Sequence, residues 1–234
     1  GDWYEIEDVF YYGVINQSTV MLFDAIERAG LKFSIMYEDR TIAAMINNGH
    51  LQANEDVSHA QDVMRYLHDT WFMTDTYLKF ADRPVLFNFG PEYFSLSTQW
   101  DEVFSVLASK PVFLTLNTPI VPVAEGAFSC PPMGASVNGI LQQGALDSYL
   151  SNFAFQSSFW DSNVPGAFPG FQDIYAQAGL GFSYGYLDPR DGDTFQNTLD
   201  QATLSDAEVV QIITWNDFGE GTTVEPTTEY GFQY

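Results

Sequence analysis

The sequence predicts an α/β fold, and more specifically a (β/α)8 barrel formed by a single domain over residues 1–234. Short, continuously apolar runs alternate with amphipathic stretches, as expected for parallel strands covered by helices on both faces. No glycine-rich fingerprint lies between a strand and a helix, which disfavours an open dinucleotide-binding sheet. Polar residues follow several apolar runs, at positions that a barrel gathers at one mouth. They are Tyr37, Glu38, Asp39, Asn88, Asn117, Asp173, Asn216 and Asp217.

The apolar runs predict the strands in order along the chain. The first run enters a polar loop, and the last run, EVVQIITW, reads as a continuous apolar strand. The expected strands cover 31–40, 83–91, 110–117, 126–130, 168–171, 181–187 and 208–215.

Apolar residues at helical spacing predict the helices that separate these strands. Ser18 and Gly30 are suited to begin and end the first helix. Ser97 can cap another helix, and Asp193 with Gln196 has the spacing of a capping box. The expected helices cover 19–29, 58–72, 97–107, 146–153 and 193–202.

The strand count falls below the eight of a complete barrel. Six or seven runs qualify as strands, and DWY (2–4) reads as the end of a strand whose apolar body lies outside the sequence. We therefore expect the chain to lack one or two N-terminal strands and the last helix, so that the barrel is incomplete at both ends.

Composition narrows the classes of partner. The chain has 31 acidic and 8 Lys or Arg residues, a formal net charge of −23, so it repels phosphate backbones and anionic membranes. No apolar run reaches the roughly 20 residues of a membrane span. Cys130 is the single cysteine and reads as a buried, inert thiol. The three histidines are not spaced as ligands on one helix face, so we expect no metal and no cofactor.

Two carboxylates stand out near the C-terminal end, in TWNDFGEGT (214–222). Asp217 and Glu220 follow a predicted strand, beside Trp215 and Asn216. Two acids that face one cleft take different pKa values, which supplies an acid and a base for glycoside hydrolysis. Asn216 can bond a sugar hydroxyl and Trp215 can stack on a sugar. The alternative is a pair of solvated loop acids, with Asp217 capping a turn.

The motif WNDFGEGTTVEPT (215–227) followed by EYGF (229–232) resembles the signature of glycoside hydrolase families 71 and 99 and the bacterial proteins grouped between them. Three further segments are similar to that group, so the resemblance spans most of the chain. They are GLKFSIMYED (30–39), YLKFADRPVLFNFG (77–90) and FPGFQD (168–173).

The resemblance implies a (β/α)8 barrel that hydrolyses α-linked glycans, often in the interior of a chain. By the D-x-x-E pattern of family 71, considered inverting, Glu220 would be the general acid and Asp217 the base. Family 99 carries E-x-x-E, and its first acid is thought to deprotonate the sugar 2-hydroxyl. The continuation EGTTVEP is similar to family 99, so this chain combines both patterns and leaves retention and inversion open.

Other residues are expected to support the site. Tyr37, Glu38 and Asp39 end a strand and are expected to bind sugar, with an ion pair to Arg40 as the alternative for the two acids. Glu225 is expected to contact sugar or to position the catalytic loop. Asp2 and Trp3 would line the barrel mouth, with a frayed chain terminus as the alternative.

The function expected from these features is an endo-acting glycosidase that cleaves polysaccharide or glycan. A carbohydrate-binding barrel without turnover is the alternative. An acidic surface protein that binds Ca²⁺ is disfavoured, because DPRDGD (188–193) lacks the spacing of a calcium loop. The expected partner is an oligo- or polysaccharide, with no nucleic acid, membrane or protein partner indicated. A secreted, periplasmic or cell-surface location follows from the substrate class.

Overall fold

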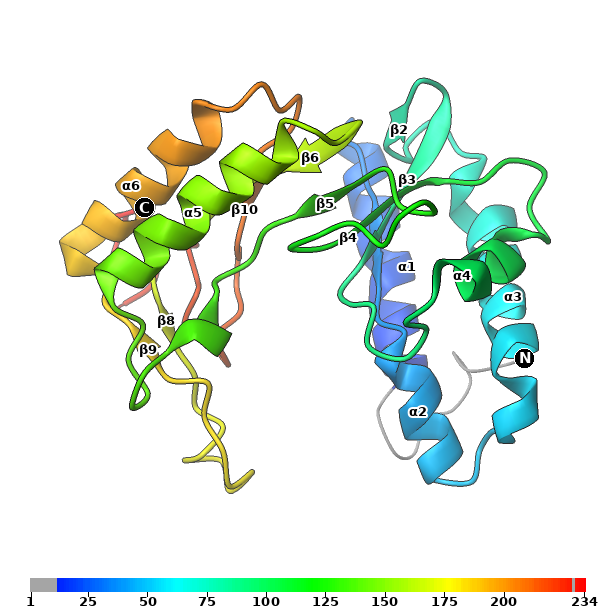
Figure 1. The fold of residues 1–234 in the computed structure, drawn as a ribbon, viewed down its shortest axis with the longest axis horizontal. Helices are drawn as coiled ribbons and strands as arrows, with labels where there is room; N and C mark the ends of the chain where they lie inside the picture. Colours follow the sequence, from blue (N-terminus) through cyan, green and yellow to red (C-terminus); the bar gives the residue numbers. More distant parts are fainter. Residues whose placement is uncertain (1–11, 229) are drawn as a thin grey trace. The chain divides into compact units, whose positions relative to one another are not determined.

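The computed structural model describes residues 12–228 and 230–234. The chain divides into two compact units, Gly1–Glu125 and Gly126–Tyr234, which are described separately below (Figure 1). Asp2 and Trp3, and with them the expected strand end at DWY, lie outside the described residues.

The first unit builds a parallel sheet with helices between its strands, as the α/β pattern predicts. The parallel strand order is β1-β3-β4, with β2 antiparallel to β3. A π-helical turn at His68–Phe72 continues α3, and a 3₁₀ turn at Ala53–Glu55 precedes it. The elements are α1 (Tyr12–Arg28), β1 (Ile35–Tyr37), α2 (Arg40–Asn47), α3 (Asp56–Leu67), β2 (Lys79–Phe80), β3 (Arg83–Asn88), α4 (Ser97–Phe104) and β4 (Val112–Leu116).

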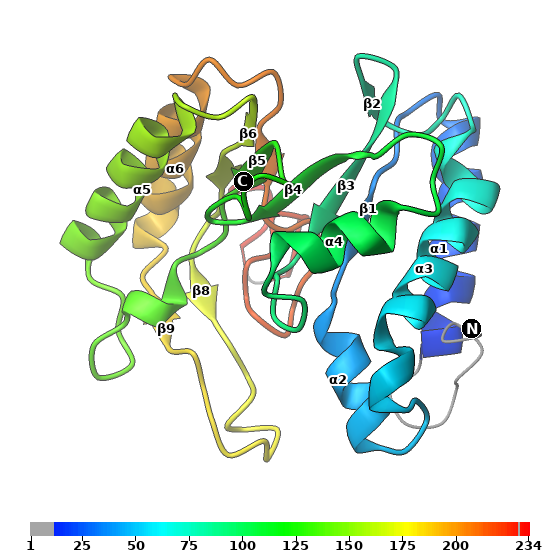
Figure 2. The ribbon, with the colours of Figure 1, turned by 45° about the vertical axis from the view of Figure 1, so that its right-hand side comes forward.

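Aromatic side chains dominate the core of this unit. Trp100 is fully buried, and its ring centroid lies 4.6 Å from that of Phe113 and 5.6 Å from that of Phe94. The indole N–H donates to the Phe94 carbonyl at 2.8 Å, which satisfies the one polar group of the buried ring. Helices α3 and α4 lie side by side over this core (Figures 1 and 2).

The strand register brings polar strand ends together. Tyr37 at the end of β1 pairs with Asn88 of β3, and Asn88 pairs with Thr115 of β4. Since the strands are parallel, these side chains share one edge of the sheet. Tyr37 and Asn88, two of the polar residues predicted at strand ends, therefore lie side by side.

The second unit contains shorter strands and two helices, α5 and α6, which lie side by side in both ribbon views (Figures 1 and 2). β5 pairs with β6 and β7 with β10, both parallel, while β8 and β9 are antiparallel. Short 3₁₀ turns occupy Met133–Ala135 and Arg190–Gly192. The elements are β5 (Gly126–Phe128), α5 (Gln143–Ser157), β6 (Ser162–Val164), β7 (Gly166–Ala167), β8 (Phe171–Gln172), β9 (Tyr186–Leu187), α6 (Asp193–Thr203) and β10 (Gln211–Ile212).

A buried hydroxyl ties α6 to the strand side of the second unit. The Thr198 hydroxyl accepts the Phe168 N–H at 3.0 Å and lies 3.0 Å from the Phe168 carbonyl oxygen. Phe168 and Phe171 form the apolar core here, together with Leu146 and Leu187. The chain that leads to β8 is therefore held by the Thr198 hydroxyl and by apolar packing.

Several predicted elements differ from the structure. The continuous buried strand expected over 208–215 is wrong: only Gln211–Ile212 pairs, because β7 offers two partner residues, and Ile212 is 52% exposed. The capping box expected at Asp193 is also wrong, since the N-cap is Gly192 at φ 100° without a side-chain cap. Helix α2 begins at Arg40, where a polar loop was expected.

Candidate active site

The chain after β10 forms a closed loop that carries both predicted catalytic acids. The Thr214 N–H donates to the Thr222 carbonyl at 2.8 Å, and the two hydroxyl oxygens lie 2.9 Å apart. The Val224 and Glu225 N–H groups both bond the Trp215 carbonyl, at 3.2 and 3.0 Å. These bonds close the segment 214–225 at its base, so its tip has a fixed backbone.

Asp217 and Glu220 stand on one tight turn at the tip of that loop. The Asp217 N–H donates to the Thr214 hydroxyl at 3.0 Å, and the Glu220 N–H donates to Asp217 Oδ1, also at 3.0 Å. Asp217 therefore caps the turn. The sequence left this role open as the alternative to a catalytic one. The same bond sets the backbone position of Glu220 relative to the Asp217 carboxylate.

Gly221 lets this loop dock on β8. The Gln172 N–H donates to the Glu220 carbonyl at 2.9 Å, and the Ile174 N–H donates to the Gly219 carbonyl at 3.0 Å. Gly221 has φ +64°, and a Cβ there would lie 2.9 Å from the Gln172 carbonyl oxygen. A side chain at this position would push the loop away from β8, so the sequence needs glycine here.

Tyr175, which the sequence analysis missed, bonds the second of the two acids. Its hydroxyl donates to Glu220 Oε1 at 2.9 Å. Burial raises the pKa of Tyr175, and the hydrogen bond to Glu220 and the negative charges of Glu220 and Asp217 raise it further. The phenol thus stays protonated and holds the Glu220 carboxyl group in one orientation. Asp217 is close enough for its charge to act on the same phenol.

Cys130 lies close enough to Glu220 for the charge of that acid to act on its thiol. Burial, followed by the negative charge of Glu220, raises the pKa of the Cys130 thiol to about 12. The thiol is therefore neutral at physiological pH and a poor nucleophile. This agrees with the inert thiol that the sequence predicts.

Three further residues of the loop differ in their exposure. Trp215 is 62% exposed, and Asn216 is also exposed. Glu225 is partly buried, and its N–H belongs to the bonds that close the loop. The indole face and the carboxamide are thus accessible to a ligand from solvent.

The predicted residues of the first unit have different surroundings. Tyr37 is buried and makes an edge-on contact with Trp100, with ring centroids 6.4 Å apart. Glu38 is partly exposed and forms an ion pair with Arg40, at 2.7 Å between Oε2 and Nε. This ion pair is the alternative that the sequence left open for Glu38.

The Asp39 carboxylate is buried and accepts backbone N–H groups of the turn after β3. It is 0% exposed, and its Oδ2 accepts the N–H groups of Tyr93 and Phe94 at 2.7 and 2.9 Å. The Glu92 N–H reaches both carboxylate oxygens. This arrangement differs from the expected role in binding sugar hydroxyls, because neither oxygen reaches the surface. A Cβ at Gly90 would lie 2.5 Å from Asp39 Oδ1, so the turn needs glycine.

Metal binding finds no support in the described part of the chain. Across residues 12–228 and 230–234, no group of three or more His, Cys, Asp or Glu side chains could hold a metal ion. Over the same ranges, every helix is too short or too polar to cross a membrane.

Comparison with known proteins identifies the fold. The sequence matches no protein-family model and no curated protein. The structure, however, is similar to that of a family GH99 endo-alpha-mannosidase from Bacteroides thetaiotaomicron in complex with Bis-Tris propane: the TM-score is 0.63 at 17% identity, over 90% of this chain and 65% of that chain. A second structure of a GH99 endo-alpha-mannosidase from that organism gives a TM-score of 0.64 at 16% identity, over 96% and 63% of the two chains.

A glycoside hydrolase-like protein is also similar, with a TM-score of 0.53 at 12% identity over 76% of this chain and 59% of that chain. The chain therefore has an α/β, TIM-barrel-like fold of the kind found in glycoside hydrolases, which confirms the predicted fold class. It spans 65%, 63% and 59% of the length of these three chains.

Proposed function

We propose that this chain is a glycoside hydrolase that cleaves α-linked polysaccharide or glycan at interior bonds. The observation that carries the proposal is the cluster of Asp217, Glu220 and Tyr175, in which one turn bears both acids and one phenol bonds the second acid. The fold, shared with glycoside hydrolases, supports it. The endo mode and the α-linkage come from the neighbours' activity and from the sequence motif.

In the proposed reaction Glu220 is the general acid. It gives its proton to the glycosidic oxygen as the bond from that oxygen to the anomeric carbon breaks. Tyr175 orients the Glu220 carboxyl group by donating a hydrogen bond to Glu220 Oε1. The Tyr175 hydroxyl stays protonated at neutral pH, because its pKa is raised. It therefore orients Glu220 as a hydrogen-bond donor and does not remove the proton that Glu220 transfers.

Asp217 is the proposed base. In an inverting reaction it accepts a proton from the water that attacks the anomeric carbon, and the sugar leaves with opposite anomeric form. In the route implied by family 99, it would accept the proton of the sugar 2-hydroxyl instead. Both routes use the carboxylate that caps the turn at 3.0 Å from the Glu220 N–H.

The exposed residues of the loop supply proposed substrate contacts. Trp215 offers a stacking face to a pyranose, and Asn216 can donate to and accept from a hydroxyl. Glu225, on the same loop, is proposed as a further contact. The reaction needs no cofactor, and a secreted, periplasmic or cell-surface location is proposed because its polysaccharide substrates lie outside the cell.

A substrate screen tests this function. The chain is incubated with α-mannan, α-1,3-glucan and other algal or fungal polysaccharides, and products are resolved by size and by anomeric form. We expect a ladder of intermediate fragments from an α-linked polymer, since an interior cut does not release single sugars. Binding to a polymer without any product would instead identify a carbohydrate-binding protein, and neither binding nor product would contradict both functions.

A further inference from the structure

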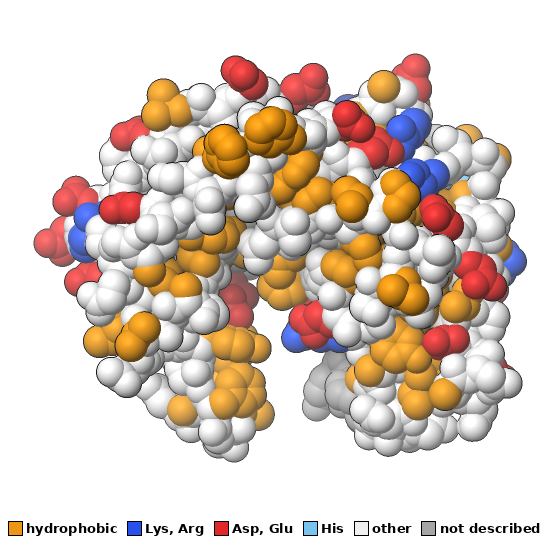
Figure 3. Space-filling view, in the orientation of Figure 1, with side chains coloured by type: hydrophobic (Ala, Val, Ile, Leu, Met, Phe, Trp, Pro, Cys, Tyr) orange, Lys and Arg blue, Asp and Glu red, His pale blue; other side chains and the backbone are white. Residues whose placement is uncertain are grey.

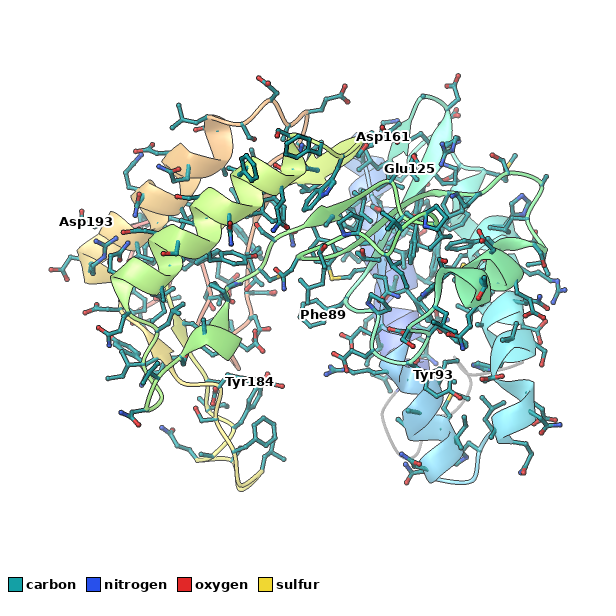
Figure 4. The ribbon with its side chains drawn as sticks, viewed as in Figure 1. Phe89, Tyr93, Glu125, Asp161, Tyr184 and Asp193 are labelled. Carbon is teal, nitrogen blue, oxygen red and sulfur yellow. The ribbon has the colours of Figure 1, made fainter. Side chains whose placement is uncertain are left out.

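Three aromatic rings cluster on the loop between β8 and β9. The ring centroid of Tyr175 lies 5.5 Å from that of Phe182 and 5.8 Å from that of Tyr184, and the last two are 5.5 Å apart. Phe182 is 48% and Tyr184 47% exposed. Figure 4 places Tyr184 on this loop, and Figure 3 shows hydrophobic side chains gathered toward its tip. We call these three residues the aromatic platform.

A buried carboxylate fixes the backbone under the platform. Asp173 is 6% exposed, and its Oδ2 accepts the Tyr184 N–H at 2.6 Å and the Ser183 hydroxyl at 3.0 Å. Its Oδ1 accepts the Tyr175 N–H at 3.1 Å. One charged group thus ties both arms of the loop together, so the rings are held in place before a ligand arrives. Pre-organisation of this kind lowers the entropic cost of binding.

The platform is continuous with the proposed general acid. Tyr175 belongs to the platform and also donates to Glu220 Oε1 at 2.9 Å. A ligand that rests on Phe182 or Tyr184 therefore lies next to the carboxyl group that would protonate a glycosidic oxygen. The charges of Glu220 and Asp217 both act on Tyr175, so this surface is unfavourable for an anionic ligand.

We propose that the aromatic platform is a sugar-binding subsite. It stacks on the apolar face of a neutral pyranose in a residue adjoining the bond that is cleaved, and it selects neutral glycans over uronate-rich or sulfated ones. This inference rests on the proposed function. A protein partner is a poorer fit, because the exposed rings are few and lie beside two acids, whereas a sugar offers an apolar face and hydroxyls together.

Binding and kinetics of platform variants test the proposal. The probe is the glycan that the parent cleaves, and affinity is measured by calorimetry in the Glu220→Gln background, where the substrate stays intact. Phe182→Ala and Tyr184→Ala should each weaken binding about tenfold, an effect of about 1.4 kcal/mol, within the range of one aromatic contact. Tyr184→Phe keeps the ring and should bind within about twofold of the parent, which separates ring stacking from a folding defect.

The chain offers a matched control in the same unit. Phe155 and Phe159 form an exposed ring pair at and just after the end of α5, with centroids 5.4 Å apart, and Phe159 is 74% exposed. Phe159→Ala should leave glycan affinity unchanged. With Glu220 intact, the platform variants should raise KM more than they lower kcat, because the ring binds ground state and transition state alike.

The outcomes separate the platform from the proposed function. If the parent cleaves a glycan but Phe182→Ala and Tyr184→Ala bind it as tightly as Phe159→Ala does, the platform is not a subsite while the hydrolase stands. If the parent prefers a uronate-rich polymer, the selection for neutral sugars is overturned. If no glycan is bound or cleaved, both proposals fall.

Discussion

The turn after β3 depends on a single carboxylate, that of Asp39, and its removal gives a sharp test of the packing described above. Asp39→Ala deletes the acceptor for the N–H groups of Glu92, Tyr93 and Phe94. Hydrogen bonds to a charged group contribute about 1.5–3 kcal/mol each. Glu92 is exposed, so water can replace its bond, and only the bonds of Tyr93 and Phe94 count in full. The expected loss is therefore about 3 kcal/mol or more in the free energy of unfolding.

Urea unfolding followed by tryptophan fluorescence measures this loss, because Trp71 and Trp100 are buried in the same unit. Glu38→Gln is the matched control: it neutralises the neighbouring acid, whose exposed ion pair with Arg40 contributes less than about 1 kcal/mol. If Asp39→Ala is no less stable than Glu38→Gln and only glycan binding weakens, then Asp39 is a ligand and the reasoning is refuted.

Further predictions concern three other positions. In Gly221→Ala the new Cβ would meet the Gln172 carbonyl oxygen, which costs about 1–3 kcal/mol of strain. This variant should therefore have a lower thermal midpoint and slower hydrolysis than the parent. An unchanged thermal midpoint would contradict the docking of the loop on β8. Burial raises the pKa of Tyr77 to about 12, whereas a tyrosine in the unfolded chain has a pKa near 10. The free energy of unfolding should therefore fall as pH rises from about 10 to 12. The urea midpoint of Tyr77→Phe should fall less steeply over the same range. With a pKa of about 12, Cys130 should react with a thiol reagent at pH 8 about 1,000-fold more slowly in the native than in the unfolded chain; equal rates would contradict its burial.

Strands that are apolar on both faces could be predicted from the sequence, and shorter ones could not. No residue of β3 or β4 is exposed, and four of the five residues of β4 are buried, so their apolar pattern is continuous. β10 was predicted too long because its length depends on the two residues of its partner β7, which the sequence of β10 does not contain. Helix α2 was missed although Ile42 and Met45 have helical spacing, since the acids before it favoured a loop.

The candidate site shows the same division between local and distant information. Asp217 and Glu220 are close in sequence, so their common turn could be predicted from D-x-x-E with a glycine on each side of Glu220. Tyr175 lies 45 residues from Glu220, and only the docking of the loop on β8 brings the two together. Asp39 shows the converse limit: a buried acceptor of backbone N–H groups and an exposed sugar ligand have the same sequence signal. Phe182 and Tyr184, between Gly181 and Gly185, were the sign of the platform that the sequence offered.

Hydrolysis by acid variants tests the central claim most directly, namely that the turn of Asp217 and Glu220 performs the chemistry. Glu220→Gln and Asp217→Asn keep the size of each side chain, and an amide at 217 still offers an oxygen to the Glu220 N–H. We predict that each variant unfolds near the parent's midpoint and binds the same glycan, but cleaves it at least about 100-fold more slowly, the contribution expected of a general acid or base. Full activity in both variants, on a substrate that the parent cleaves, would contradict the account.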